Sequence, residues 1–341
     1  MQQAHNGNIN SRAKAATTAP VVSFVIPVRN DARRLARCLA TIRANHYPQG
    51  RIEVVVVDNG STDESVDVAK HASAKVLVRP GLSVGQLRNL GAAAASGEIL
   101  AFVDADHEIV PEWVGYAVET LSRSNVGVVG SLCEAPGAGT WVQHTYDLLR
   151  RRPAGVREVE WLGSGNLALW RRTFEAAGGF DSRLQTCEDV DLCRRVRLGG
   201  VRILQDSRLR NVHLGDPATL QELFRGELWR GRDNLRASLR PPVALRDLPS
   251  IVLPIADVSL AAVALVALLT GGKVGLLVAG IAVSLILGAA AARAARMMTQ
   301  PSQMTALRCG QAFAVALVYD LARALALLRP GRHEARRAVR P

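Results

Sequence analysis

Short apolar runs alternate with amphipathic segments through the N-terminal part of the chain. β-Branched residues fill each run, as in VVSFVIPV at 21–28 and IEVVVV at 52–57, which is typical of buried strands. Between these runs, apolar residues recur at helical spacing. The pattern predicts strands at 21–28, 52–57, 75–79 and 99–103, with helices at 31–45, 65–73 and 84–95. Strands that alternate with helices form βαβ units, so the predicted fold class is α/β, with a mixed, mostly parallel sheet flanked by helices.

The polarity of the chain changes near residue 250. Between 251 and 292 the only charged residues are Asp257 and Lys273. The runs 251–270 and 274–292 are each long enough, at about 1.5 Å per residue, to cross a hydrocarbon core of about 30 Å. The short, glycine-containing link between them predicts a transmembrane helical hairpin.

A third apolar stretch, 303–328, is interrupted by Arg308, Asp320 and Arg323. These charges leave uninterrupted stretches that are too short for a span, so we predict an amphipathic helix in the membrane interface. A third span is the alternative. The whole order is then a flexible leader (1–20), a globular domain (21–222), a basic juxtamembrane linker (223–250), the transmembrane hairpin (251–292), the interfacial or third membrane helix (303–328) and a basic tail (329–341).

The net charge of +12 does not indicate a nucleic-acid partner, because aromatic residues make up only 4% of the chain and no base-reading motif occurs. Many arginines instead lie at 223–246 and 329–340, beside the apolar region, where basic residues meet anionic lipid head groups. We therefore predict membrane lipids as partners. The bias of positive charge toward the cytoplasm predicts a cytoplasmic globular domain. Five cysteines without a Cys-x-x-Cys pair indicate reduced thiols, which suits that compartment.

Polar residues follow three of the predicted strands, at 29–31, 58–61 and 104–106. Ligands of such sheets bind beyond the carboxyl ends of the strands, so these residues are candidates for a site. If the extended geometry continues, Asp104 and Asp106 point to one face and can hold Mg²⁺ or Mn²⁺ together with phosphate oxygens. A solvated turn is the alternative for this Asp-x-Asp pair. Asp58 can accept hydrogen bonds from a nucleoside or simply close an Asx turn.

Strand-end motifs, glycine-containing loops, an acidic cluster and a late histidine follow one another along the chain. They are IPVRND (26–31), VVDNGSTDES (56–65), GQLRNLGAAAASGEILAFVDADHEI (85–109), GSGNLALWRRTFEAAGGFD (163–181), CEDVDLCRRV (187–196) and His213. Each is unspecific alone, but in this order they closely resemble the family 2 glycosyltransferases over 21–215. The resemblance implies a glycosyltransferase-A (Rossmann-like) fold, a nucleotide-sugar donor of the UDP or GDP type, and Mg²⁺ or Mn²⁺.

The resemblance also implies roles for single residues. It assigns donor binding to Pro27, Val28, Asn30, Asp58, Arg88 and Asp104, metal binding to Asp106 and His213, and the acceptor side to Gly163, Ser164, Gly165, Asn166 and Glu188. Local alternatives stay open for several of these. Arg88 can be a solvated helix residue, His213 a buried or capping histidine, and the loop 163–166 a tight turn.

Asp189 matches the second residue of the family's Glu-Asp motif, which implies that it is the general base. An acceptor hydroxyl is a poor nucleophile, so a carboxylate beside it removes the proton as the new bond forms. One displacement then inverts the anomeric configuration. The local alternative for Glu188 and Asp189 is favourable charge at a helix N-terminus, which is compatible with catalysis. Asp191 is expected to pair with Arg194 or Arg195.

The implied function is inverting transfer of a sugar to a lipid-linked or cell-surface glycan acceptor at the bacterial inner membrane, as in exopolysaccharide or cell-envelope synthesis. The segment 224–230 lacks the Gln-x-x-Arg-Trp motif of processive synthases, which favours transfer of single sugars. Two alternatives remain. One is a polyprenyl-phosphate sugar synthase, whose phosphate acceptor needs no strong base. The other is a catalytically silent membrane scaffold, which the retained carboxylates argue against.

Overall fold

The computed structural model describes residues 19–48, 50–151, 153–239, 248–298 and 304–328. Most of the predicted leader, part of the basic linker and the whole basic tail lie outside these residues. The described residues divide into two compact units, one within 19–137, 153–184 and 188–216, and the other within 138–151, 185–187 and 217–328. The second unit thus takes three short segments, 138–151, 185–187 and 217–222, from the predicted globular domain.

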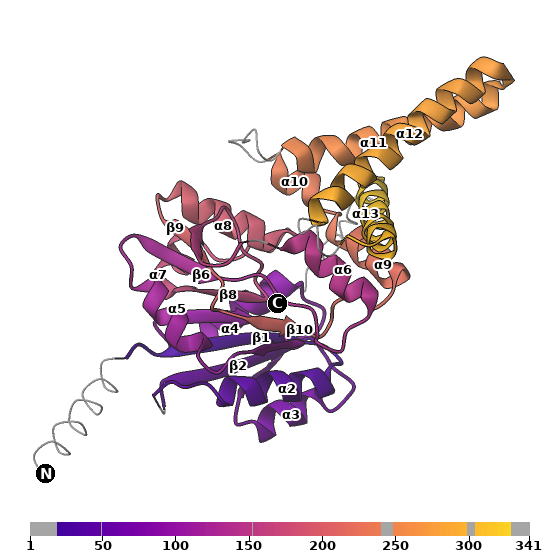
Figure 1. The fold of residues 1–341 in the computed structure, drawn as a ribbon. Coiled ribbons are helices and arrows are strands. Elements are labelled where there is room, and N and C mark those ends of the chain that lie inside the picture. Colours follow the sequence, from indigo (N-terminus) through magenta and orange to yellow (C-terminus); the bar gives the residue numbers. More distant parts are fainter. Residues whose placement is uncertain (1–18, 49, 152, 240–247, 299–303, 329–341) are drawn as a thin grey trace, which may run out of the picture. The chain divides into compact units, whose positions relative to one another are not determined.

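An eight-stranded mixed sheet forms the centre of the first unit (Figure 1). Its strand order is β3-β2-β1-β4-β8-β6-β9-β7, and β3, β2, β1 and β4 are parallel. The strands are β1 (Val22–Val28), β2 (Ile52–Asp58), β3 (Lys75–Val78), β4 (Ile99–Val103), β6 (Val126–Gly130), β7 (Val156–Glu158), β8 (Asn166–Trp170) and β9 (Arg202–Asp206). The predicted α/β fold class and its four N-terminal strands are confirmed.

Helices accompany the strands of this unit. They are α2 (Ala32–Arg43), α3 (Ser65–His71), α4 (Val84–Ala94), α5 (Trp113–Leu121), α7 (Arg171–Ala176) and α8 (Glu188–Leu198). α2 forms where the apolar spacing predicts it, and its buried residues are Leu35, Cys38, Leu39 and Ile42. A capping box of Ser83 and Gln86 begins α4.

The apolar core lies on both faces of the sheet because neighbouring residues of a strand point in opposite directions. Phe24 and Ile26 of β1 join one buried cluster with Leu35 of α2, whereas Val25 joins the other cluster with Leu87 of α4. Burial on both faces explains why these strands are continuously apolar rather than alternating. The sheet is therefore a rigid base that holds the loops at its carboxyl edge.

A small two-stranded sheet stands beside this edge. β5 (His107–Ile109) follows β4 after a tight turn, and β10 (Asn211–His213) pairs with it in antiparallel register, so that His213 is opposite His107. Residues that are more than 100 positions apart in the sequence thus come side by side.

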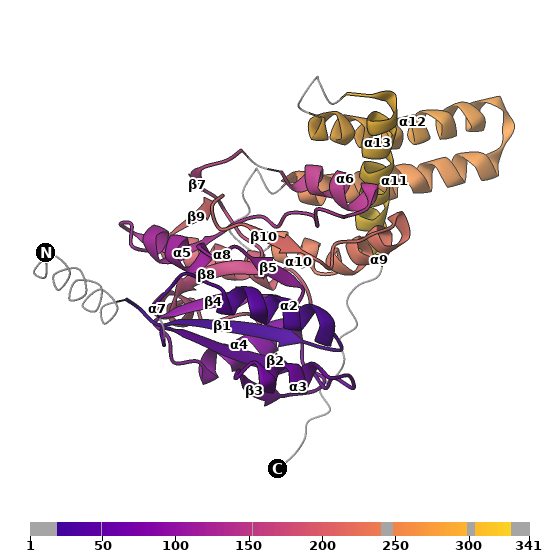
Figure 2. The ribbon, with the colours of Figure 1, turned by 60° about the horizontal axis from the view of Figure 1, so that its bottom comes forward.

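The second unit is helical. Its helices are α6 (Trp141–Arg150), α9 (Leu220–Arg230), α10 (Asn234–Ser238), α11 (Leu248–Thr270), α12 (Gly272–Met297) and α13 (Ala306–Leu327). α11 and α12 form the predicted hairpin (Figure 2). A side chain at Gly275 would collide with the carbonyl oxygen of Ala267, so glycine lets the two helices approach closely.

Three described helices, α11, α12 and α13, are long and apolar enough to cross a membrane. α13 is continuous over 22 residues although it contains the charges that the sequence analysis counted as interruptions. Asp320 pairs with Arg293 of α12 at 2.7 Å, and Arg323 pairs with Glu227 of α9 at 2.7 Å. Because these charges are paired inside the unit, they are compatible with a long apolar helix.

Candidate active site

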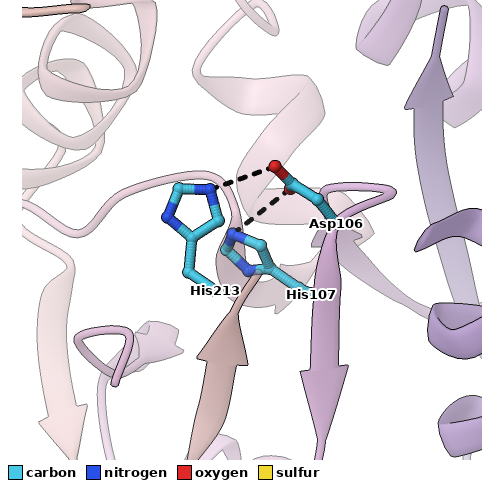
Figure 3. A group of neighbouring side chains, drawn as sticks. All are labelled: Asp106, His107 and His213. Carbon is cyan, nitrogen blue, oxygen red and sulfur yellow. Dashed lines mark hydrogen bonds and ion pairs between the residues drawn. The ribbon is translucent and has the colours of Figure 1, made fainter. Parts of the chain in front are cut away.

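Three side chains at the β5–β10 pair could hold a metal ion. One ligand atom from each of Asp106, His107 and His213 lies within 4.8 Å of the others (Figure 3). Nε2 of His213 is 3.2 Å from Oδ2 of Asp106, and Nε2 of His107 is 3.8 Å from Oδ1. The structure thus brings together the two predicted metal ligands and adds His107.

A turn separates Asp106 from the strand that precedes it. β4 ends at Val103, and the backbone N–H of His107 donates to the carbonyl of Asp104 at 3.1 Å. The extended geometry considered for the Asp-x-Asp pair therefore does not continue. Asp106 faces the histidines, whereas Asp104 pairs with Arg88 at 2.6 Å. The turn gives the two carboxylates different partners.

Asp216 orients His213 from behind. Its buried carboxylate lies 2.7 Å from Nδ1 of His213, so Nδ1 keeps its proton and Nε2 is directed at Asp106. Burial alone would lower the pKa of His213, but hydrogen bonds to Asp106 and Asp216 raise it to about 9. Burial alone would likewise raise the pKa of Asp106, yet His213 outweighs this effect and the pKa lies below its ordinary value. The Asp106 carboxylate is therefore kept in its ionised form, which is the form that can bind a metal ion.

The donor set fits a transition-metal ion. Two imidazoles and one carboxylate are softer than the all-oxygen shell that Mg²⁺ prefers, so the set suits an ion such as Mn²⁺ better. Gly215 supports this arrangement because a Cβ atom there would overlap the Asp106 carboxylate. The close approach of backbone and carboxylate requires glycine at this position.

Arg88 is buried between two carboxylates. Its guanidinium donates to Asp104 at 2.6 Å and to Glu188 at 2.7 Å, and the residue is only 3% exposed. The solvated alternative for Arg88 is thereby wrong. Its Nε atom is buried without a hydrogen-bond partner in the described structure. Arg88 joins the end of β4 to the start of α8 through its two terminal nitrogens.

Asp189 lies at the first turn of α8, where the acidic cluster predicted a helix start. Its Oδ1 accepts from the N–H of Val190 at 2.7 Å, and its Oδ2 accepts from the N–H of Ser164 at 3.4 Å. Burial raises the pKa of both Asp189 and its neighbour Glu188, in spite of the positive charge of Arg88. A raised pKa makes a carboxylate a stronger base. Asp191 pairs with Arg195 at 2.7 Å, as expected.

The loop 163–166 lies between the metal-site residues and Asp189. A Cβ atom at Gly165 would come within 2.6 Å of the His107 ring and 2.9 Å of Asp104, and one at Gly163 would lie 3.8 Å from Asp189. Glycine at 165 therefore has a steric reason, whereas Gly163 is in ordinary van der Waals contact with Asp189. The side chain of Asn166 is turned inward, where its amide bonds to Trp113, Ser131 and Leu209.

Asp58 ends β2 at the same carboxyl edge of the sheet. Its Oδ2 accepts from the backbone N–H groups of Gly60 and Ser61 at 2.9 and 3.0 Å, which is the Asx turn that the sequence allows. Its Oδ1 is buried without a hydrogen-bond partner among the described residues. A buried carboxylate oxygen without a donor is costly, so a ligand N–H or O–H would be bound favourably there.

The neighbouring loop is connected to this turn. Asn30 has a left-handed backbone (φ 51°), and its side-chain oxygen accepts from the N–H of Thr62 at 2.7 Å. Pro27 and Val28 belong to β1, beyond the last β1 residue that pairs with β4, Val25. The absence of an N–H at Pro27 therefore leaves no gap in that ladder.

Sequence reasoning missed His107, Asp216 and Gly215. His107 directly follows Asp106 within the segment 85–109. Only the pairing of β5 with β10 shows that it lies beside His213. Asp216, three residues after His213, could have been found as a second acidic residue near the late histidine. Their proximity depends on tertiary structure.

Comparisons with known proteins agree with this geometry. The family model for glycosyl transferase family 2 matches residues 23–174. Glycosyltransferase AglE of Haloferax volcanii is 28% identical over 242 residues, which cover 67% of this chain and 78% of that protein. The pre-mycofactocin glycosyltransferase of Mycobacterium tuberculosis is 32% identical over 195 residues, but these cover only 53% of this chain and 40% of that protein.

Solved structures show the same fold. The mannosyltransferase PcManGT from Pyrobaculum calidifontis, in complex with GDP-Man and Mn²⁺, superposes with a TM-score of 0.58 at 19% identity and covers 95% of this chain and 96% of that one. GalNAc-T7 with UDP, GalNAc and Mn²⁺ gives a TM-score of 0.50 at 18% identity over 68% of this chain and 53% of that one. The family match thus identifies residues 23–174 of this chain as a glycosyl transferase family 2 domain, and the solved structures show that its fold is that of the glycosyltransferase-A class.

Proposed function

We propose that the protein transfers a sugar from a nucleoside-diphosphate sugar to a hydroxyl of a lipid-linked or cell-surface glycan, with inversion at the anomeric carbon. The observation that carries the proposal is the position of the loop 163–166. Gly165 lies against the metal-site residue His107, and Ser164 donates to Asp189. A leaving diphosphate needs a metal site and an attacking hydroxyl needs a base, and the two must lie on opposite sides of one sugar.

Asp106, His107 and His213 are the residues that would hold the metal ion. When bound, a divalent cation stabilises the negative charge that develops on the departing diphosphate. The histidine ligands favour Mn²⁺ over Mg²⁺. The structures of PcManGT and GalNAc-T7, which contain Mn²⁺, support this choice of ion. Asp216 would keep His213 in the tautomer that presents Nε2 to the ion.

Asp189 would act as the general base. Its two backbone hydrogen bonds fix the carboxylate, and its raised pKa increases its affinity for the proton of an acceptor hydroxyl. Because the base removes this proton directly, no covalent sugar intermediate on the protein is needed. Arg88 would hold Asp104 and Glu188 in place beside it.

The unpartnered Oδ1 of Asp58 would accept from the nucleoside, and Asn30 would shape the adjoining loop. The GDP-Man and UDP of the two structural neighbours support a GDP or UDP donor. The three apolar helices support an acceptor at the membrane, and the bias of flanking arginines in the sequence supports a cytoplasmic first unit. Nucleotide sugars are made in that compartment.

The test is transfer by the full-length protein in detergent, with a panel of UDP- and GDP-sugars, Mn²⁺ or Mg²⁺, and a membrane lipid extract as acceptor. We expect metal-dependent turnover of one donor, lost in both Asp106→Ala and Asp189→Asn and retained in Asp67→Asn, a control at an exposed residue of α3. Donor binding without turnover would instead support a scaffold. Turnover by Asp189→Asn with a polyprenyl-phosphate acceptor would support a phosphate-acceptor synthase.

A further inference from the structure

Two of the three residues before α8, Gln185 and Thr186, are hydrogen-bonded to Asp233, which follows α9. Oδ2 of Asp233 accepts from the N–H of Gln185 at 2.8 Å and from that of Thr186 at 3.2 Å. In return, the N–H of Asp233 donates to the Thr186 hydroxyl at 3.3 Å. Asp233 is 6% exposed and Thr186 is 3% exposed. A buried carboxylate that accepts two backbone N–H groups makes hydrogen bonds about twice as strong as neutral ones.

Cys187 adopts a backbone that the loop would not favour by itself. Its φ of 61° lies in the left-handed region, which is unfavourable for a residue with a side chain. Its thiol lies 3.9 Å from the carbonyl oxygen of Arg230. Cys187 is bonded directly to Glu188, the first residue of α8. Asp189 comes only two residues later.

The segment 231–234 that carries Asp233 is itself fixed to the apolar helices. A Cβ atom at Gly231 would come within 2.6 Å of Ala326 on α13, so this turn is packed directly on that helix. Asn234 donates to the carbonyl of Ser250 on α11 at 2.9 Å. This carbonyl lacks its helical donor because the residue four positions later is Pro254, which has no N–H.

A buried charge network holds α9 against α13. Glu227 is fully buried, and it pairs with Arg323 of α13 at 2.7 Å, with Arg230 at 2.9 Å, and with the Tyr146 hydroxyl of α6 at 2.7 Å. α9 therefore cannot shift along α13 without unpairing a buried carboxylate, which is strongly unfavourable. The loop before α8 thus receives its position from the apolar helices.

We propose that Asp233 is a positioning residue for the general base, because it holds the residues that directly precede Glu188 and Asp189 in the chain. This inference rests on the proposed role of Asp189. Loss of the Asp233 carboxylate would free the loop to leave the left-handed conformation at Cys187. A displacement of about 1 Å at a reacting group is sufficient to lower a rate by about 100-fold.

The test compares Asp233→Ala, Asp233→Asn and Asp189→Asn in the full-length protein, with Arg232→Ala as a control at the exposed neighbour. Binding of Mn²⁺ with GDP or UDP reports on folding of the first unit. We expect Asp233→Ala to lower kcat about 10- to 100-fold while the donor KM and Mn²⁺ binding stay within about twofold. Asp233→Asn should keep kcat within about fivefold, because its amide oxygen accepts the same N–H groups.

A second pair of variants tests the backbone conformation at Cys187. Cys187→Val places a β-branched residue at positive φ, where it is strongly disfavoured, and should lower kcat without weakening Mn²⁺ binding. Cys309→Val, at an exposed cysteine, should change neither quantity.

Normal kcat in Asp233→Ala together with an inactive Asp189→Asn would overturn the positioning role alone. Equal loss of kcat and of nucleotide binding in both Asp233 variants would show a purely structural role. An active Asp189→Asn would instead refute the proposed base.

Discussion

The substitution Asp216→Asn tests the metal site without touching any of its ligands. The carboxylate of Asp216 is fully buried and 2.7 Å from Nδ1 of His213. Asparagine has nearly the same size and can still accept from Nδ1–H through its oxygen, but it carries no charge. Loss of the charge weakens the preference of His213 for the tautomer in which Nε2 carries no proton. It also makes the imidazole a poorer metal ligand. The protein should fold normally and bind the metal ion less tightly.

The magnitude follows from the position of Asp216 behind a ligand. Changes to such partners typically lower metal affinity by about 10- to 100-fold, which corresponds to about 1.4–2.7 kcal/mol. The loss should be near the upper end, because the carboxylate is fully buried and its hydrogen bond is short. Transfer at saturating metal should recover toward the wild-type rate, since the substitution removes no ligand.

The assay is a Mn²⁺ titration of the full-length protein, followed both by calorimetry and by the rate of transfer. Glu119→Gln is the matched control, because it neutralises a carboxylate of an exposed ion pair with Arg208. It should leave the Mn²⁺ affinity unchanged. An unaltered Mn²⁺ affinity in Asp216→Asn, with His213→Ala also binding normally, would refute the assignment of His213 as a ligand.

Two further outcomes are expected from the same geometry. Ionised Asp189 is needed for transfer and its pKa is raised, so kcat should fall on the acidic side at a pH above the ordinary aspartate value. Glu188→Gln removes a neighbouring negative charge and should move this acidic limb of the kcat–pH profile to lower pH. An acidic limb that does not move would contradict the prediction. Glu227→Gln leaves Arg323 without its buried counterion and should destabilise the protein by about 3–5 kcal/mol in chemical denaturation, whereas Glu119→Gln should change stability by less than about 1 kcal/mol.

The sequence by itself determined the elements whose causes are local. Runs of β-branched residues predicted β1, β2 and β4 to within a residue or two, because strands buried on both faces must be apolar throughout. The acidic residues at 188–191 predicted the start of α8, since negative charge is favourable at a helix N-terminus. The order of motifs predicted the family whose model matches residues 23–174, and the Asp-x-Asp pair lies at the carboxyl edge of the sheet, as expected from the end of a strand.

Only the tertiary structure decided which of these residues meet. His107 becomes a candidate ligand because β5 pairs with β10, and Arg88 becomes a buried bridge because α4, β4 and α8 converge on it. The charges of α13 interrupt an apolar stretch in the sequence, yet Asp320 and Arg323 find partners on α12 and α9. Each of these contacts joins residues that are distant in sequence. Local propensity carries no information about such pairs, because the free energy that selects them comes from burial and charge pairing in the folded chain.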